Sequence, residues 1–211
     1  FGPAKKWKEL HWKGKSSETV PGDNVMVSVL GVRNDNSTVL LKDFSMTEQD
    51  VDISDISAAE FPRLMLQMRN SDSIHYTPYQ LDYWRVVYEP VPEGVLAPNL
   101  FLISKDTIGF GQQLEFGIAF KNISEIPFDS MMKVKVTLTD QNNVTHLLPV
   151  ADLKVLPAGD TILFRYTIDT RNYAGANTLF IEFNPDNHQA EQYHFNNFLY
   201  KTIYVAGDNT K

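Results

Sequence analysis

Apolar and polar residues alternate along much of the chain, which is the pattern of half-buried β-strands. In the first half, Val25, Val27 and Val29 fall on one face of such a strand. The alternation is more regular in the second half, where it predicts strands near residues 114–120, 134–138, 162–168, 179–183 and 198–205. No window carries the sustained apolar spacing of a long helix. We therefore expect an all-β protein made of antiparallel sheets.

A proline-rich segment divides the chain into two halves. The stretch EPVPEGVLAPN, residues 89–99, contains three prolines and one glycine. Such a composition is expected to support neither a strand ladder nor a helix. The sequence therefore predicts a first β module over 1–91, a linker over 92–98 and a second β module over 99–207.

The number and spacing of the strands indicate two β-sandwich modules. From residue 100 onward there are about seven short strands at the spacing of an immunoglobulin-like or fibronectin-like sandwich. The first module has about five or six strands, fewer than the eight of a double-sheet jelly roll. We expect it to be a partial jelly roll, and the count leaves open that further strands precede Phe1.

Composition and charge exclude several classes of function. With 43% hydrophobic and 21% charged residues among 211, the chain can bury a core. Its formal charge of −7 argues against nucleic-acid binding, which depends on Lys and Arg contacts to phosphate. We interpret the basic amino-terminal stretch as the solvated face of an edge strand, because edge lysines oppose unwanted pairing. No apolar run is long enough to predict a transmembrane helix.

The chain contains no cysteine, so thiol nucleophiles, disulfides and thiolate metal sites are excluded. Neither a G-x-S-x-G nor an H-E-x-x-H motif occurs. His188 and His194 lie near the end of the chain at a spacing unlike a helical metal-binding pair. If His194 begins the last strand, the neighbouring Tyr193 and Phe195 are expected to face the core and His194 the solvent. We assign no catalytic and no cofactor-binding residue.

Calcium is the one ion that the sequence leaves open, because it prefers several carboxylate and carbonyl oxygens. Asp50, Asp52 and Asp55 form one acidic cluster, and Asp186 with Glu191 precedes the last strand. The alternative is that these side chains cap backbone amides in turns. We favour capping in both places and predict no cofactor, with calcium as the alternative.

Aromatic residues could also stack against a sugar ring. The stretch YTPYQLDYWRVVY, residues 76–88, contains Tyr76 and Tyr79, and Trp12 lies in the amino-terminal stretch. These three are candidate glycan contacts. Trp84 alternates with Val86 and Tyr88, so we expect it in the core rather than on a carbohydrate platform.

Six stretches carry a resemblance to a known group of proteins: LHWKGKSSET, DISDISAAEFPRLML, TPYQLDYWRVVYEPVPEG, FGIAFKNIS, IDTRNYAGANTLFIEFNP and EQYHFNNFLYKTI. The sequence resembles the non-catalytic carboxy-terminal region of Bacteroidetes gingipain-like (caspase-like) cysteine peptidases and surface proteins associated with type IX secretion. The resemblance implies a galactose-binding-like jelly roll followed by a cell-adhesion-related (CARDB) immunoglobulin-like domain. Glu191, Asn196 and Asn197 match the ending of that domain, an acidic residue followed by Asn-Asn.

The same resemblance implies a context. Such a segment would be a non-catalytic stalk or protein-interaction part of a larger protein that is secreted, at the cell surface or on the periplasmic side of the outer membrane. Its partners would be other domains of the parent chain, surface proteins or glycans. The catalytic Cys and His of the peptidases belong to a separate domain. A carbohydrate-binding module is the alternative, and an independent enzyme is the third hypothesis.

Overall fold

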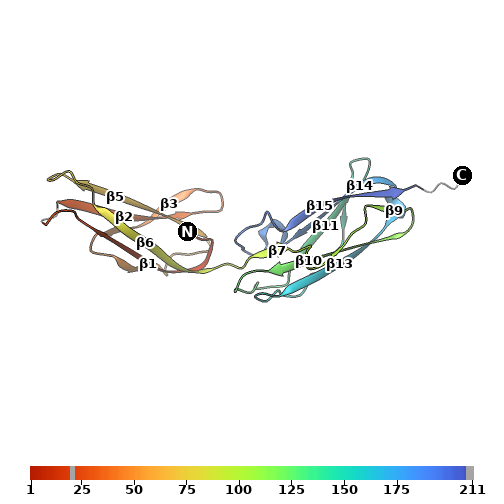
Figure 1. Ribbon diagram of the computed structural model, residues 1–211, viewed down its shortest axis with the longest axis horizontal. Coiled ribbons are helices and arrows are strands. Elements are labelled where there is room, and N and C mark those ends of the chain that lie inside the picture. The colour runs from red at the N-terminus through yellow and green to blue at the C-terminus, as the bar shows by residue number, and fades with distance from the viewer. Residues whose placement is uncertain (20–21, 208–211) are drawn as a thin grey trace. The chain divides into compact units, whose positions relative to one another are not determined.

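The computed structural model describes residues 1–19 and 22–207, and their regular secondary structure is almost entirely β-strand (Figure 1). The chain divides into two compact units, the first covering Phe1–Val91 and the second beginning at Pro92. Within the described residues, the only helical segments are two single 3-10 turns, η1 (Thr170–Asn172) and η2 (Pro185–Asn187). No helix in this part of the chain is long and apolar enough to cross a membrane. The prediction of an all-β fold is confirmed.

The first unit consists of two three-stranded antiparallel sheets. One sheet has the order β4-β1-β6 and the other has the order β3-β2-β5. The strands are β1 (Ala4–Lys15), β2 (Asp23–Val32), β3 (Thr38–Ser45), β4 (Asp50–Asp52), β5 (Arg63–Asp72) and β6 (Gln80–Pro90). The first and last strands pair along nearly their whole length. The amino-terminal lysines are exposed, as expected, but β1 is not an edge strand along its whole length, because β4 pairs with it at residues 9–11.

The core of the first unit lies between its two sheets and depends on irregularities in β1. The inward side chains of this strand are Ala4, Trp7, Leu10 and Trp12, all buried. Ala4, Trp7 and Leu10 are three residues apart, and residues three apart in a regular strand point to opposite faces. Strict alternation would therefore turn Trp7 away from the core. The register against β6 shifts directly after Ala4 and directly after Trp7, so each β-bulge absorbs one residue and returns the next apolar side chain to the core.

The second unit is a sandwich of a smaller and a five-stranded sheet. In the smaller sheet β10 lies between β13 and β7 and also pairs with β8, while the larger sheet has the order β12-β11-β14-β15-β9. The strands are β7 (Gly94–Leu96), β8 (Leu102–Ile103), β9 (Thr107–Gly109), β10 (Gln113–Asn122), β11 (Val134–Thr139), β12 (Thr145–Leu148), β13 (Thr161–Asp169), β14 (Gly175–Phe183) and β15 (Phe198–Ala206). β9 pairs with β15 in parallel, and the other ladders of this unit are antiparallel. This alternation of the chain between two sheets is the immunoglobulin arrangement.

The expected linker over 92–98 is not free of regular structure. Residues 94–96 form β7, which pairs with the end of β10. The prolines at 90, 92 and 98 lie outside these three residues, so the backbone amides between them remain available as donors. Gly94 is required at its position, because a Cβ there would lie 2.2 Å from Cζ of the buried Phe120 ring.

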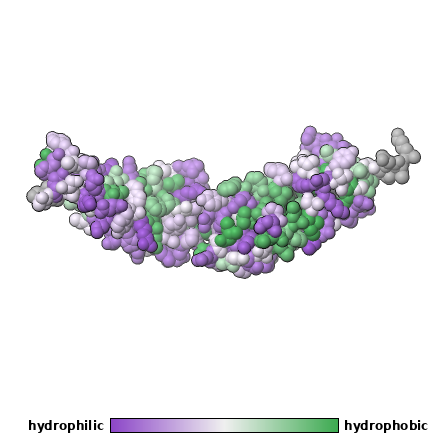
Figure 2. All heavy atoms as spheres, viewed as in Figure 1, coloured by the Kyte–Doolittle hydropathy of each residue, from purple (hydrophilic) through white to green (hydrophobic). Residues whose placement is uncertain are grey.

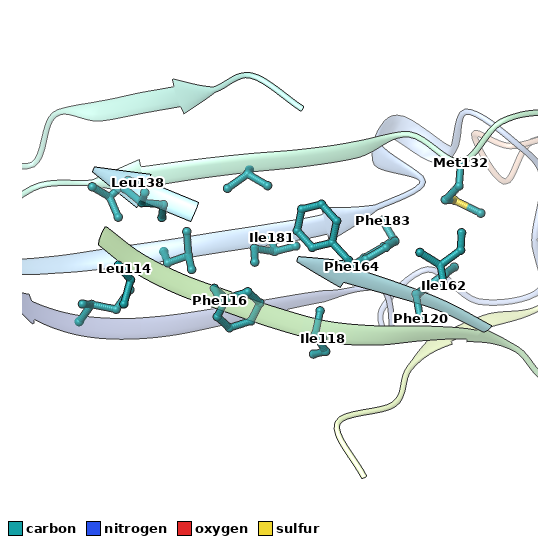
Figure 3. Close-up of a cluster of buried hydrophobic side chains, with 14 of the residues drawn as sticks. Leu114, Phe116, Ile118, Phe120, Met132, Leu138, Ile162, Phe164, Ile181 and Phe183 are labelled. Atoms are coloured by element: carbon teal, nitrogen blue, oxygen red, sulfur yellow. The ribbon is translucent and has the colours of Figure 1, made fainter. Parts of the chain in front are cut away.

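Aromatic rings from both sheets meet in the core of the second unit (Figure 3). The Phe120 and Phe183 rings stack with centroids 4.5 Å apart, and Phe164 meets Phe183 edge-on at 5.6 Å. Leu114, Phe116, Ile118 and Phe120 are buried at alternate positions of β10. The alternating pattern in the second half of the sequence therefore identifies the core faces correctly.

Trp12 and Trp84 differ in burial, so substituting each of them tests how much burial stabilises the first unit. Trp12 is fully buried, whereas Trp84, expected in the core, is only half-buried and packs at its margin. We expect Trp12→Ala to lower the free energy of unfolding of this unit by ~3 to 5 kcal/mol. Trp84→Ala should cost less, and Tyr76→Ala at an exposed ring should change it by less than about 0.5 kcal/mol. Urea unfolding followed by circular dichroism measures all three, and an equal loss for Trp12 and Trp84 would contradict the burial argument.

Candidate functional site

The first acidic cluster does not assemble into a calcium site. Asp50 Oδ1 lies 2.6 Å from Nδ1 of His11 on the neighbouring strand. Asp52 accepts the backbone amide two residues later at 2.7 Å, and Asp55 forms an ion pair with Lys42 at 2.7 Å. Each carboxylate is directed at its own partner, so the structure does not bring the three together.

His11 lies in a shallow charged cleft of about 460 Å³ on the outer side of β1 and β4. Its Nε2 is 2.9 Å from Glu9, so both ring nitrogens contact carboxylates. The hydrogen bond that His11 donates to the Asp50 carboxylate raises the pKa of His11 most, and Glu9 adds to the increase. A ring engaged on both sides favours the imidazolium form and has no free nitrogen for a metal. This cross-strand contact follows from the β1–β4 register, which the sequence pattern does not reveal.

Two of the three candidate glycan contacts are buried. Trp12 is 1% exposed and donates its indole N–H to the carbonyl of Glu48 at 2.8 Å. Tyr79 is 7% exposed and packs edge-on against Trp12. Neither ring can be reached by a sugar, because both fill the core between the sheets. Tyr76 is 84% exposed and remains accessible.

The two acidic residues before the last strand occupy different environments. Asp186 is exposed and has a left-handed backbone conformation, with φ of 57°. Glu191 is buried, with 6% of its surface exposed. Among the described residues, no group of three or more His, Cys, Asp or Glu side chains is placed to hold a metal ion.

Glu191 is the centre of a hydrogen-bonded group formed by the β14–β15 connection. Its Oε1 accepts from Nδ2 of Asn184 at 2.7 Å and from Nδ2 of Asn197. Asn184 also fixes the loop backbone, because it donates to the carbonyl of Gln189 at 2.7 Å and accepts its amide at 2.8 Å. The polar residues that the sequence shows here therefore do stabilise a turn, but they also enclose a carboxylate.

A second buried carboxylate, from the beginning of the same unit in the sequence, belongs to this group. Glu93, which is 5% exposed, precedes β7. Its Oε2 accepts the backbone amide of Tyr193 at 2.8 Å and its Oε1 accepts Nδ2 of Asn196 at 2.6 Å. We call Glu93, Asn184, Glu191, Asn196 and Asn197 the Glu93–Glu191 cluster. Sequence reasoning missed Glu93, since only the folded chain brings it to the β14–β15 connection.

The environment of Glu191 opposes its ionisation. Burial raises the pKa of Glu191 to about 7, and the nearby charge of Glu93 adds to the increase. The hydrogen bond from Asn184 acts in the opposite direction but is weaker than the effect of burial. The cluster is therefore the most strongly perturbed acidic site that the structure describes.

The expected orientation of residues 193–195 is wrong. Tyr193 and Phe195 are 57% and 72% exposed. His194 is the residue that turns inward, with Nε2 2.9 Å from the carbonyl oxygen of Asn184. The inversion arises because these residues precede β15 and form a turn whose backbone Glu93 holds, so the alternation of a strand does not apply to them.

Exposed aromatic rings gather on the outer side of the five-stranded sheet. Phe180 on β14 is paired with Tyr200 on β15, and its ring contacts those of Tyr200 and Phe198 at centroid distances of 4.7 and 6.0 Å. Tyr204 is on the same side of β15, and Leu147 extends the row across β11 to β12. We call these five residues the aromatic face. Apart from half-buried Phe180, each is between 39% and 71% exposed.

The rings of the aromatic face do not form a flat platform. Phe180 and Tyr200 are inclined by 37°, and Phe198 and Tyr200 by 77°. The nearby pair Tyr193 and Phe195 is inclined by 57°. A sugar ring stacks on flat, coplanar aromatic surfaces, whereas mutually tilted rings suit the irregular surface of another protein.

A second apolar feature of this unit is a cleft of about 380 Å³ between its two sheets. Leu96, Phe116, Ile118 and Leu199 line it, together with the Asp106–Lys201 ion pair at its polar side. Figure 2 shows hydrophobic residues gathered on the visible side of this unit, over the region where Figure 1 labels β7, β10 and β15. Core residues such as Phe116 and Ile118 therefore line an opening at the surface of this unit.

Fold and site together define an all-β protein whose second unit has immunoglobulin topology and an enclosed acidic cluster. No family model and no curated protein matches the sequence. Among solved structures, the chain is similar to the CARDB domain of a Pyrococcus furiosus protein in complex with di-metal ions. The two sequences are 16% identical, the match covers 55% of this chain and 90% of that chain, and the TM-score is 0.45. CARDB domains, which the resemblance of the sequence implied, are thus among the matches.

Two enzymes also match through small parts of their chains. A β-glucosidase from Listeria innocua in complex with isofagomine is 16% identical, with 60% of this chain and 17% of that chain covered and a TM-score of 0.40. Red sea bream transglutaminase is 10% identical, with 94% of this chain and 31% of that chain covered and a TM-score of 0.40. This chain thus spans less than a third of either enzyme.

The raised pKa of Glu191 predicts a specific dependence of stability on pH. Because the folded pKa is about 7 and the ordinary value is 4.5, the folded state holds this proton more tightly than the unfolded state. The contribution to stability is complete below about pH 4.5 and is lost as the pH rises through about 7, by up to ~3 kcal/mol. Glu191→Gln should remove this loss. Urea unfolding with EDTA at about pH 5 and about pH 8 measures it, and an unchanged pH dependence in the variant would refute the assignment.

Proposed function

We propose that this chain is a non-catalytic accessory segment of a larger protein and that its second unit binds another protein through the aromatic face. The observation that supports this is the row of exposed rings and Leu147 across β12, β14 and β15. Soluble proteins rarely expose contiguous apolar patches of this kind without a partner. Tyrosine and phenylalanine are also enriched in the centres of protein interfaces.

A protein partner is favoured over a glycan for a geometric reason. The tilted rings of the aromatic face offer no coplanar stacking surface, and the buried Trp12 and Tyr79 cannot contribute one. Tyr76 alone remains exposed among the earlier candidates. A carbohydrate-binding module is therefore the alternative that the test below must separate from a protein-binding one.

The wider context of the proposal rests on the sequence resemblance. We propose that the parent protein is a gingipain-like peptidase or another type IX-associated surface protein of Bacteroidetes. Such a protein would be secreted, displayed at the cell surface or held on the periplasmic side of the outer membrane. In that setting the partner would be a further domain of the parent chain or a neighbouring surface protein. Fractionation of the native host with antibodies against this segment tests the location, and a purely cytosolic signal would contradict it.

The aromatic face can be tested by site-specific photocrosslinking in the native host. A photoreactive benzoyl-phenylalanine replaces Tyr200, which is 67% exposed at the middle of the face. The matched control places it at Leu163, which is 58% exposed on β13 in the other sheet. We expect a discrete adduct at position 200, identified by mass spectrometry as a peptide of another domain or protein, and no such adduct at position 163.

Other results would reject the proposal. Equal crosslinking at both positions would mean nonspecific contact, and no adduct at position 200 would mean that the face is unoccupied. A carbohydrate adduct at position 200, together with glycan-array binding that Tyr200→Ser abolishes, would establish the carbohydrate-binding alternative.

A further inference from the structure

The Glu93–Glu191 cluster contains oxygen atoms whose hydrogen-bonding capacity is unused. Glu191 Oε2, Asn196 Oδ1 and Asn197 Oδ1 are all buried and have no hydrogen-bond partner within the described structure. Asn197 itself is fully buried. Buried polar atoms are normally paired, so three orphans in one place require an explanation. All three are acceptors, which means that the missing partner is a donor or a cation.

The orphan oxygens belong to groups whose other atoms already bond within the cluster. Glu191 receives two amide donors on Oε1, which leaves Oε2 beside the same carboxylate carbon. Asn197 donates to Glu191 and Asn196 donates to Glu93, each through its side-chain nitrogen. The oxygen of the same carboxamide group is therefore held close to that carboxylate. The unused acceptors are therefore held next to the two carboxylates.

Charge points to a cation rather than to a neutral donor. The donors within hydrogen-bond distance of the two carboxylates are three asparagine side chains and the backbone amide of Tyr193, all of them neutral. The backbone amide of Gly94 and the charge of His194 also act on Glu191. Ionised together, the two enclosed carboxylates would carry negative charge that burial makes costly. A bound cation would compensate this charge and occupy the orphan oxygens at the same time.

We propose that the Glu93–Glu191 cluster is a calcium-binding site, with Glu191 Oε2 and the side-chain oxygens of Asn196 and Asn197 as ligands and Glu93 supplying the second negative charge. This inference goes beyond the proposed protein contact and does not depend on it. Calcium would connect the segment that enters the second unit to the β14–β15 connection, and so would stabilise that unit.

The chemistry of the ligands selects calcium among the common divalent cations. Carboxylate and carboxamide oxygens in an irregular loop fit the flexible, all-oxygen coordination of calcium. Magnesium demands nearly ideal octahedral geometry and usually keeps several waters, which an enclosed cluster does not accommodate easily. Zinc prefers nitrogen and sulfur ligands, but the chain has no cysteine and the Nε2 of His194 is held by the carbonyl of Asn184.

The test uses the complete 211-residue chain, treated with EDTA and then given calcium or magnesium chloride. Isothermal titration calorimetry and native mass spectrometry should show one calcium ion per chain. The melting transition of the second unit should rise by several degrees with calcium and less with magnesium. In ¹⁵N-resolved spectra, the side-chain amide signals of Asn196 and Asn197 should shift as calcium is added, a readout that requires no variant.

Glu191→Gln is the decisive variant and Asp186→Asn is its matched control. Glutamine keeps an oxygen acceptor for the two asparagine donors, but it removes the charge and one oxygen ligand. We expect at least about a tenfold loss of calcium affinity in Glu191→Gln. Asp186 is an exposed carboxylate in the same connection, so its variant should bind as the unmodified chain does. Glu93→Gln gives a second test if the first variant folds poorly.

Three results would overturn the proposal. They are the absence of calcium binding by the unmodified chain, an equal response to magnesium, and calcium binding that Asp186→Asn removes while Glu191→Gln retains it. The first would mean that a proton or water satisfies the cluster. The last would mean that the ion binds at the exposed turn instead.

Discussion

The hydrogen bonds of Glu93 hold the β14–β15 connection in place, and the Glu93–Glu191 cluster depends on them. Glu93 binds the backbone amide of Tyr193 and the side chain of Asn196, and it thereby holds a turn made about a hundred residues later in the chain. His194 then points inward to Asn184, and the rings on either side of it point outward. The inward position of His194 and the outward position of the Tyr193 and Phe195 rings are thus two results of one constraint.

The sequence predicts strands well where the alternation is regular and both sheets contribute to the core. β10, β13 and β14 follow this rule, and their inward residues are buried as expected. β1 breaks the rule, because two bulges bring Trp7 and Leu10 to the core at a spacing that alternation does not show. β7 is equally hidden, since prolines surround it without occupying it. In both cases tertiary packing, rather than local preference, determines the strand.

The site shows the same division between local and long-range information. Asp52 caps a backbone amide, as a turn residue should, and the sequence is sufficient to expect this. The resemblance to CARDB endings singles out Glu191, Asn196 and Asn197, but only the fold adds Glu93 to them. Burial of Trp12 and Tyr79 is also a property of the folded sandwich, because a β-strand sequence does not specify which of its two faces meets the other sheet.

The way in which each unit pairs its last strand determines how it carries mechanical load. In the first unit the ladder of β1 and β6 is antiparallel, with Ala4 opposite Pro90, so the two ends of the unit meet at one end of the ladder. Tension applied between those ends opens the ladder one pair at a time, as in unzipping. In the second unit β9, which follows β7 and β8 in the chain, runs parallel to the last strand β15, and tension applied along this pair stretches its hydrogen bonds together in shear. The first unit is therefore expected to yield at lower force than the second.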